Sequence, residues 1–211
     1  MNAVIFDLDG TMWDSRELIF AAWKQGLEGS TLPHVPLTPE FIHWCMGKTP
    51  EEIGAEAFPN VPHDVRMVEV DRMYECENEA LRHAGGILYP QLAETLETLA
   101  KDYALFVVSN SQDGYVQAFL HWSGLTCFRD IEMAGRTGLD KGANIRLVME
   151  RNGVTKAVYV GDTQGDADAA AKAGIPFIFT EYGFGTVNAA AARIASLPEL
   201  PAAVEKIFAE Q

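Results

Sequence analysis

Two aspartates, Asp7 and Asp9, directly follow an apolar run at residues 3–6. A run rich in β-branched and aromatic residues predicts a strand buried on both faces, and functional groups of parallel sheets gather where such strands end. Two carboxylates at that place are costly to bury together unless a cation compensates them. Mg²⁺ with a phosphate-bearing substrate is the natural candidate. The alternative is an ordinary turn, because Asp and Gly both favour turns after a strand.

Ser109 and Asn110 end a second apolar run, at residues 104–109. A hydroxyl group and an exposed N–H at the end of a strand can hold a phosphate oxygen without adding positive charge. We therefore predict that Ser109 and Asn110 bind the phosphate group of a substrate. A polar turn with no ligand is the competing interpretation.

Lys141 lies at or just before the start of a predicted helix. The N-terminus of a helix favours negative charge, so a lysine gains little there from its local surroundings. Its position is better explained if the ammonium group points inward, to a carboxylate or a phosphate. A solvated lysine on the surface is the alternative.

Asp162 and Asp166 follow a third apolar run, at residues 157–161. We predict that Asp162 is a second metal ligand, with an N-cap role as its alternative. For Asp166, support of a ligand or a favourable place in the first helical turn ranks above direct binding of the metal.

The elements that position these residues are a series of strands and helices that alternate from about residue 88 onward. Such alternation predicts a doubly wound α/β sheet, and right-handed crossovers make that sheet parallel. The carboxyl ends of its strands then meet at one edge. The expected strands are 3–7, 104–109, 130–133, 157–161 and 176–180, and the expected helices are 92–101, 114–122, 143–151, 166–173 and 196–211.

Residues 14–86 contain no convincing strand and are expected to be helical. Thr38 and Thr49 each stand before a proline, which is typical of a helix N-cap. We predict an α/β catalytic core of residues 1–13 and 87–211, and an inserted all-helical cap of residues 14–86 that covers the Asp7 edge as a lid. The helices expected in the cap are 15–25, 38–45, 49–57 and 62–83.

The four motifs together resemble the haloacid dehalogenase-like phosphatase superfamily, and within it the phosphoglycolate phosphatase-like branch with a helical cap. The similarity spans nearly the whole chain and is most specific at residues 7–15 (DLDGTMWDS) and 161–166 (GDTQGD). One motif differs, because members often have Lys-Pro-x-Pro where Lys141 is followed here by Gly142.

This resemblance implies a Mg²⁺-dependent phosphomonoester hydrolase. Asp7 would attack phosphorus and form an aspartyl-phosphate, while Asp9 would protonate the leaving oxygen and then deprotonate the attacking water. Mg²⁺ would be held by Asp7, Asp162 and the backbone carbonyl of Asp9. The remaining phosphate oxygens would be bound by Ser109, Asn110 and Lys141.

Substrate choice is expected to depend on the cap, where Lys48 could meet an anionic substrate group or could simply be an exposed lysine. The sequence around it (MGKT) resembles a P-loop, but Ile42 replaces the leading glycine and no strand precedes it, so nucleoside triphosphate binding is rejected. Residues 183–185 (GFG) predict a flexible loop near the mouth of the site. The four tryptophans are interpreted as packing residues, with Trp13 nearest the site as a wall of the pocket.

Three other functions share parts of this pattern. A sugar phosphomutase of the same superfamily is the nearest alternative, and these motifs do not exclude it. A phosphoryl-receiving signalling domain also combines acids, Mg²⁺, a hydroxyl group and a lysine. Such domains have their acceptor aspartate on a strand in mid-sequence, whereas the acceptor proposed here follows the first strand. A dehalogenase would need neither the second acid at Asp9 nor a metal.

Composition limits the partners. The 211 residues include 16 basic and 30 acidic side chains, and a net charge of −14 should repel nucleic acid and anionic membranes. No stretch approaches the ~20 apolar residues of a membrane helix, and acids stand where a secretory signal would be apolar. The three cysteines support neither a disulfide framework nor a zinc site. We expect a cytoplasmic protein whose partner is a small phosphorylated metabolite.

Overall fold

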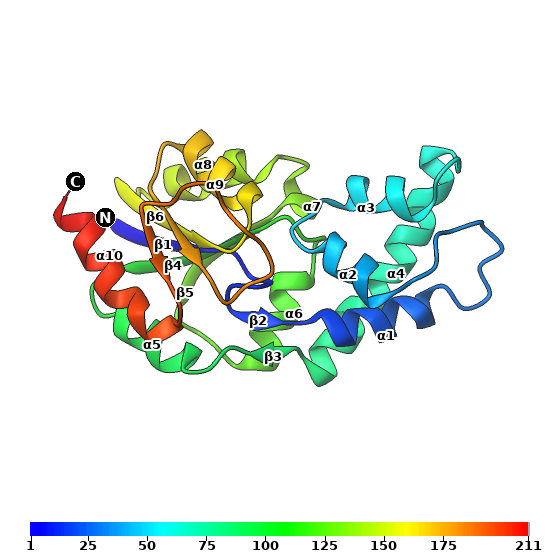
Figure 1. Cartoon of the computed structure of the whole chain (residues 1–211), viewed down its shortest axis with the longest axis horizontal. Coiled ribbons are helices and arrows are strands. Elements are labelled where there is room, and N and C mark those ends of the chain that lie inside the picture. The colour runs from blue at the N-terminus through cyan, green and yellow to red at the C-terminus, as the bar shows by residue number, and fades with distance from the viewer. Residues whose placement is uncertain (211) are drawn as a thin grey trace.

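Within residues 1–210, which the computed structural model describes, six parallel strands form one sheet (Figure 1). Their order is β5-β4-β1-β6-β7-β8, so the first strand lies inside the sheet between β4 and β6. With helices on both faces, this arrangement confirms the predicted doubly wound α/β fold. The strands are β1 (Asn2–Phe6), β4 (Ala104–Ser109), β5 (Phe128–Met133), β6 (Lys156–Gly161), β7 (Phe177–Thr180) and β8 (Ala192–Ile194).

The central strands are buried on both faces, as their apolar sequences predict. Residues 3–6 and 104–109 are all buried, and alternate side chains of β1 pack into two separate hydrophobic clusters. β1 pairs in parallel with β4 on one side and with β6 on the other. Parallel pairing brings the carboxyl ends of these strands to one edge. The residues that follow or end them there are Asp7, Ser109 and Asp162.

Helices cover the two faces of the sheet. Residues of α8 and α9 share a hydrophobic cluster with Ala3 and Ile5, whereas residues of α5, α6 and α10 share one with Val4 and Phe6 on the opposite face. In Figure 1, α8 and α9 lie above the sheet and α5 and α10 below it. These helices, with two shorter ones, are α5 (Leu92–Leu99), α6 (Tyr115–Ser123), α7 (Ala134–Thr137), α8 (Lys141–Arg151), α9 (Gln164–Ala173), η1 (Leu197–Glu199) and α10 (Leu200–Ala209).

Four helices follow one another between residues 16 and 84 and form the right half of Figure 1. Two of them begin at the expected caps. The side chain of Thr38 accepts a hydrogen bond from the Phe41 N–H, and Thr49 forms a reciprocal capping box with Glu52. We call this segment the cap. Its helices are α1 (Arg16–Gly26), α2 (Pro39–Cys45), α3 (Pro50–Ala57) and α4 (His63–Ala84).

The expectation that residues 14–86 contain no strand is wrong at its first residue. Asp14 belongs to β2 (Trp13–Asp14), which pairs antiparallel with β3 (Ile87–Leu88). Strands of two residues are too short to leave an alternating pattern in the sequence. The chain enters the cap after β2 and leaves it through β3, so this pair joins the two connections between the cap and the sheet. The division into two domains remains a prediction.

Smaller differences lie at the edges of elements. The short β8 and α7 were not predicted, because three or four residues are too few to show a periodic pattern of hydrophobic side chains. The other expected strands and helices are present, with ends that differ by one or two residues in most cases. The expected last residue of the final helix, Gln211, lies outside the described residues.

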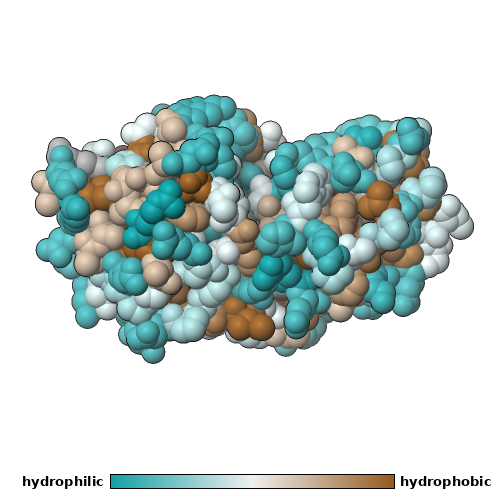
Figure 2. Space-filling model, in the orientation of Figure 1, coloured by the Kyte–Doolittle hydropathy of each residue, from teal (hydrophilic) through white to brown (hydrophobic). Residues whose placement is uncertain are grey.

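The visible surface is largely hydrophilic (Figure 2). Figure 2 shows hydrophilic side chains over most of the visible face, with apolar residues in small groups among them. Among the described helices, none combines the length and the apolar character that a membrane crossing requires. Cys45, Cys76 and Cys127 are free thiols.

Candidate active site

Lys141 points inward, as expected, and contacts two of the predicted site carboxylates. Its Nζ lies 2.9 Å from Asp7 Oδ1 and 2.6 Å from Asp166 Oδ1, and the side chain is 5% exposed. Burial lowers the pKa of Lys141, but the charges of Asp166 and Asp7 outweigh it and hold the pKa above its usual range. The lysine is therefore a fixed cation. The missing prolines after it do not displace it from the site.

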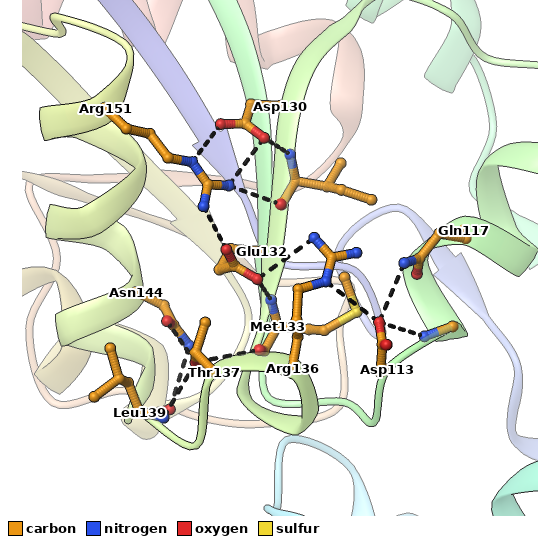
Figure 3. A network of polar contacts seen from close by, with 12 residues as sticks. Asp113, Gln117, Asp130, Glu132, Met133, Arg136, Thr137, Leu139, Asn144 and Arg151 are labelled. Atoms are coloured by element: carbon orange, nitrogen blue, oxygen red, sulfur yellow. Dashed lines mark hydrogen bonds and ion pairs between the residues drawn. The ribbon is translucent and has the colours of Figure 1, made fainter.

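A polar network anchors α8, the helix that Lys141 begins (Figure 3). At the far end of α8, Arg151 Nε donates to Asp130 Oδ2 of β5 at 2.6 Å. In the first turn, Asn144 Oδ1 accepts a hydrogen bond from Thr137 Oγ1 at 2.8 Å. The helix is thus tied at its far end to β5 and at its first turn to α7. These contacts fix the place from which the lysine reaches Asp7.

Asp7, Asp162 and Asp166 form a buried acidic cluster. One carboxylate oxygen from each lies within 4.8 Å of the others. Asp162 Oδ2 accepts a hydrogen bond from the Phe184 N–H at 2.7 Å, whereas Asp162 Oδ1 is buried with no hydrogen-bond partner. Burial, then the charges of Asp166 and Asp7, raises the pKa of Asp162 well above its usual value. One buried lysine does not compensate this cluster, which is the electrostatic condition for a cation site.

Asp166 uses both of its oxygens within the protein. Oδ1 accepts from Lys141, and Oδ2 accepts from Thr163 Oγ1 at 2.7 Å and from the Thr163 N–H at 3.0 Å. Thr163 is the N-cap of α9, and the two residues form a capping box. The alternative interpretation of Asp162 as the N-cap is therefore wrong. The pattern Thr-x-x-Asp at residues 163–166 could have assigned the cap from the sequence.

Asp9 is held by three side chains that sequence reasoning did not assign to it. Asp9 Oδ1 accepts hydrogen bonds from Trp13 Nε1 at 2.9 Å, Ser15 Oγ at 2.5 Å and Tyr115 OH at 2.6 Å. Burial raises the pKa of Asp9, although these three donors oppose the change. All three bonds end on Oδ1. Oδ2 is therefore the oxygen at which a proton can be exchanged.

The interpretation of all four tryptophans as packing residues is only partly correct. Trp13 is fully buried, but it donates to Asp9 and does not line the pocket as a wall. Trp44 is 40% exposed and lies on the cap, where its ring stacks on Phe41. Hydrophobicity alone predicts burial, whereas the indole N–H gives a tryptophan a polar role as well.

Two glycines allow backbone to approach Asp162 closely. Gly10 has a φ of +77°, and a Cβ there would lie 2.1 Å from Asp162 Oδ2. A Cβ at Gly183 would lie 2.2 Å from Asp162 Cβ and 2.6 Å from the Gly10 carbonyl oxygen. Residues 183–185, expected at the mouth of the site, thus lie against Asp162 itself. No alternating or helical pattern signals such a contact in the sequence.

Gly183→Ala should lower the unfolding temperature by about 5 °C, because forcing a methyl group into a packed site costs roughly 1–3 kcal/mol. Differential scanning calorimetry measures the shift. Gly165→Ala is the matched control, since a Cβ at that helical position meets only Thr163 Oγ1 at 3.6 Å. Equal unfolding temperatures for the two variants would contradict the close approach of Gly183 to Asp162.

A cavity of about 40 Å³ lies between the sheet and the cap. The sheet contributes Asp7 and Asp9 at its Asp7 edge, together with Ser109 and Asn110. The cap contributes Lys48, whose Nζ lies 3.5 Å from Glu52 Oε1 on α3. Predicted residues from both parts of the chain therefore line one cavity. Asp162 and Asp166 are not part of its lining, and Lys141 adjoins it through its contact with Asp7.

Asn110 also has a contact that the sequence did not predict. Its Nδ2 donates to the carbonyl oxygen of Gly47 in the cap at 2.9 Å. Ser109 Oγ accepts a hydrogen bond from the Ser111 N–H at 3.2 Å, and both Ser109 and Asn110 line the cavity. The loop after β4 thus joins the sheet to the cap at the cavity.

Residues 4–180 match the family model described as haloacid dehalogenase-like hydrolase. The chain belongs to this family. This match confirms the family that the sequence motifs predicted.

Curated relatives of this hydrolase include two bacterial enzymes named phosphoglycolate phosphatase. The one from Aliivibrio fischeri is 27% identical over 196 residues, which cover 87% of this chain and 86% of the relative. The one from Escherichia coli strain K12 is 25% identical and covers 87% of this chain and 82% of the relative. These matches support the predictions of the phosphoglycolate phosphatase-like branch and of an enzyme that is a phosphatase.

Solved structures agree with the fold of the hydrolase. A structure described as a predicted phosphatase from Clostridium acetobutylicum superimposes with a TM-score of 0.79 at 23% identity, covering 99% of this chain and 98% of the other. At that identity the likeness concerns the fold alone. It extends over both the sheet and the helical cap.

Proposed function

We propose that this haloacid dehalogenase-like hydrolase is a Mg²⁺-dependent phosphomonoester hydrolase that forms an aspartyl-phosphate on Asp7. The observation that carries the proposal is the buried acidic cluster, in which Asp162 Oδ1 has no partner, beside the buried cation of Lys141. A nucleophilic carboxylate, a cation site and a phosphate-binding ammonium group then lie within contact of one another.

The donors in the site fit Mg²⁺. Carboxylate and carbonyl oxygens are the ligands that this ion prefers, and the cluster lacks compensating charge without it. Asp7, Asp162 and, by family resemblance, the backbone carbonyl of Asp9 would hold the ion. Asp166, whose oxygens are both engaged, would support Lys141 and Asp162. When bound, Mg²⁺ offsets the negative charge that nucleophile and phosphate bring together.

The residues of the chain then divide the reaction between them. The Asp7 carboxylate attacks phosphorus, and Asp9 gives a proton from Oδ2 to the leaving oxygen. Asp9 then takes a proton from the water that hydrolyses the acyl phosphate, which releases inorganic phosphate and restores Asp7. Throughout, the phosphate oxygens are bound by Lys141, the Ser109 hydroxyl and the Asn110 N–H.

The partner in this proposal is a small phosphorylated metabolite. Support comes from the cavity, which both sheet and cap residues line, and from the curated relatives that are named phosphoglycolate phosphatase. Lys48 stays a proposed cap residue for substrate selection, since it lines this cavity. A cytoplasmic location is also part of the proposal, and the three free cysteines support a reducing compartment.

Release of inorganic phosphate from a panel of phosphomonoesters, including p-nitrophenyl phosphate, tests the proposed function. With EDTA the rate should fall at least about 100-fold, and excess Mg²⁺ should restore it, because carboxylates that must bind phosphate need the cation. Phosphate release that is indifferent to EDTA would contradict the metal. Isomerisation of a sugar phosphate without phosphate release would favour a mutase, and a phosphorylated Asp7 that persists for minutes would favour a receiver domain.

A further inference from the structure

Glu77 is an acidic residue of the cap that faces the same cavity as the two catalytic aspartates. It lies on α4, is 2% exposed, and lines the cavity with Asp7 and Asp9. Glu77 Oε1 accepts a hydrogen bond from Gln112 Nε2 at 3.0 Å, and Oε2 accepts one from Trp23 Nε1. One donor comes from the loop after β4 and the other from α1. The carboxyl group is therefore held in place from both sides.

No cation of the described residues forms an ion pair with Glu77. Both of its partners are neutral, and Lys48, the basic residue that lines the cavity, pairs with Glu52 instead. Burial, helped by the charge of Asp9, raises the pKa of Glu77 to about 8. A buried carboxyl group without a cation is costly, and natural proteins keep few of them without a functional reason.

The surroundings of Glu77 suit a small cation. Trp23 and Tyr74 line the cavity beside it, with ring centroids 6.0 Å apart in an edge-to-face arrangement. Aromatic rings attract a cation through their negative faces, and a carboxylate attracts it by charge. As an ammonium group binds, Glu77 gives up its proton to solvent and becomes the counter-ion. The negative charge of a carboxylate in the same place would oppose the ionisation of Glu77 and Asp9 beside it, and such a substrate is therefore disfavoured.

We propose that Glu77 is a specificity residue, which selects phosphomonoesters whose leaving group carries an ammonium group and disfavours those whose leaving group carries a carboxylate. The inference rests on the proposed phosphatase function and names the substrate class of that same site. It also separates this chain from the name of its curated relatives, because phosphoglycolate has a carboxylate where the ammonium group is expected.

Three phosphomonoesters of two-carbon alcohols test this inference. They are 2-aminoethyl phosphate, 2-hydroxyethyl phosphate and phosphoglycolate, which differ at the terminal group. With Mg²⁺ present, kcat/KM for the wild type should fall in that order, by about tenfold or more between the first and the last. In Glu77→Gln, which keeps the size of the side chain, the three values should come within about threefold of one another because the charge is gone.

Glu75→Gln is the matched control. It removes the same charge from α4 at an exposed position, and it should leave the wild-type order intact. A wild type that prefers phosphoglycolate overturns the inference even if Glu77→Gln does not fold. An unchanged order in a folded Glu77→Gln also overturns it, as does hydrolysis of p-nitrophenyl phosphate with none of the three. If no ester is hydrolysed, p-nitrophenyl phosphate included, the proposed function fails and this inference with it.

Discussion

Asp7→Asn should lower kcat for phosphate release by about 10⁴-fold or more, because an amide cannot serve as the nucleophile that forms the acyl phosphate. The substitution preserves the size of a buried side chain at the end of β1. Burial and the charge of Asp166 raise the pKa of Asp7 to about 7, so removing its charge eases the burial of the cluster. Single-turnover assays with radiolabelled ester measure both phosphate release and phosphate bound to protein.

The control for this loss is structural. Lys141 keeps its 2.6 Å contact with Asp166 in the variant, so the unfolding temperature should stay within a few degrees of the wild type. Asp168→Asn, at an exposed position of α9, should retain full activity. Residual activity of Asp7→Asn above about 1% of the wild type would place the nucleophile elsewhere.

Asp9→Asn should slow the hydrolysis of alkyl phosphates by about 10³-fold, which is the usual size of a general acid–base contribution. An amide keeps a carbonyl oxygen for the Trp13, Ser15 and Tyr115 donors but has no proton for the leaving oxygen. Steady-state phosphate release from 2-hydroxyethyl phosphate measures the effect. Intact mass is recorded with each assay, because asparagine before Gly10 deamidates readily.

A good leaving group separates the two tasks of Asp9. p-Nitrophenolate needs no proton to depart, so the first step on p-nitrophenyl phosphate should survive in Asp9→Asn. Hydrolysis of the acyl phosphate still needs a base, and the variant should therefore release about one equivalent of p-nitrophenol in a burst and then stall. Equal losses on both esters, with no burst, would contradict the assignment of Asp9 as the acid.

The sequence predicted the chemical groups of this site better than their neighbours. Asp7, Asp162 and Lys141 each come directly after a strong apolar run or at a helix start, and parallel strands must then bring them together. The inward direction of Lys141 could be predicted although the motif differs from the usual family pattern. A lysine gains little at a helix N-terminus unless it meets an anionic partner. Local pattern and fold agree at these positions.

The surroundings of Asp9 and Asp162 could not be predicted in the same way. Tyr115 meets Asp9 from more than a hundred residues away in sequence, and Gly183 meets Asp162 through a loop without periodicity. Glu77 looks like one acid among many on a polar helix, and only its contacts show that it is buried. Such contacts depend on the packing of segments that lie far apart in the sequence, which no local pattern encodes.

The short ribbon of β2 and β3 gives the enzyme a single pivot. Both connections between the cap and the sheet run through it, side by side, so we expect any movement of the cap relative to the sheet to turn about this pair. The cavity between sheet and cap, about 40 Å³, is far smaller than the roughly 300 Å³ at which ligand pockets commonly begin. We therefore expect the cap to move away from the sheet both when the ester enters and when its products leave. Because Asp7 follows a strand of the sheet and Glu77 lies on the cap, the proposed nucleophile and the proposed specificity residue can contact one substrate only when the cap lies against the sheet.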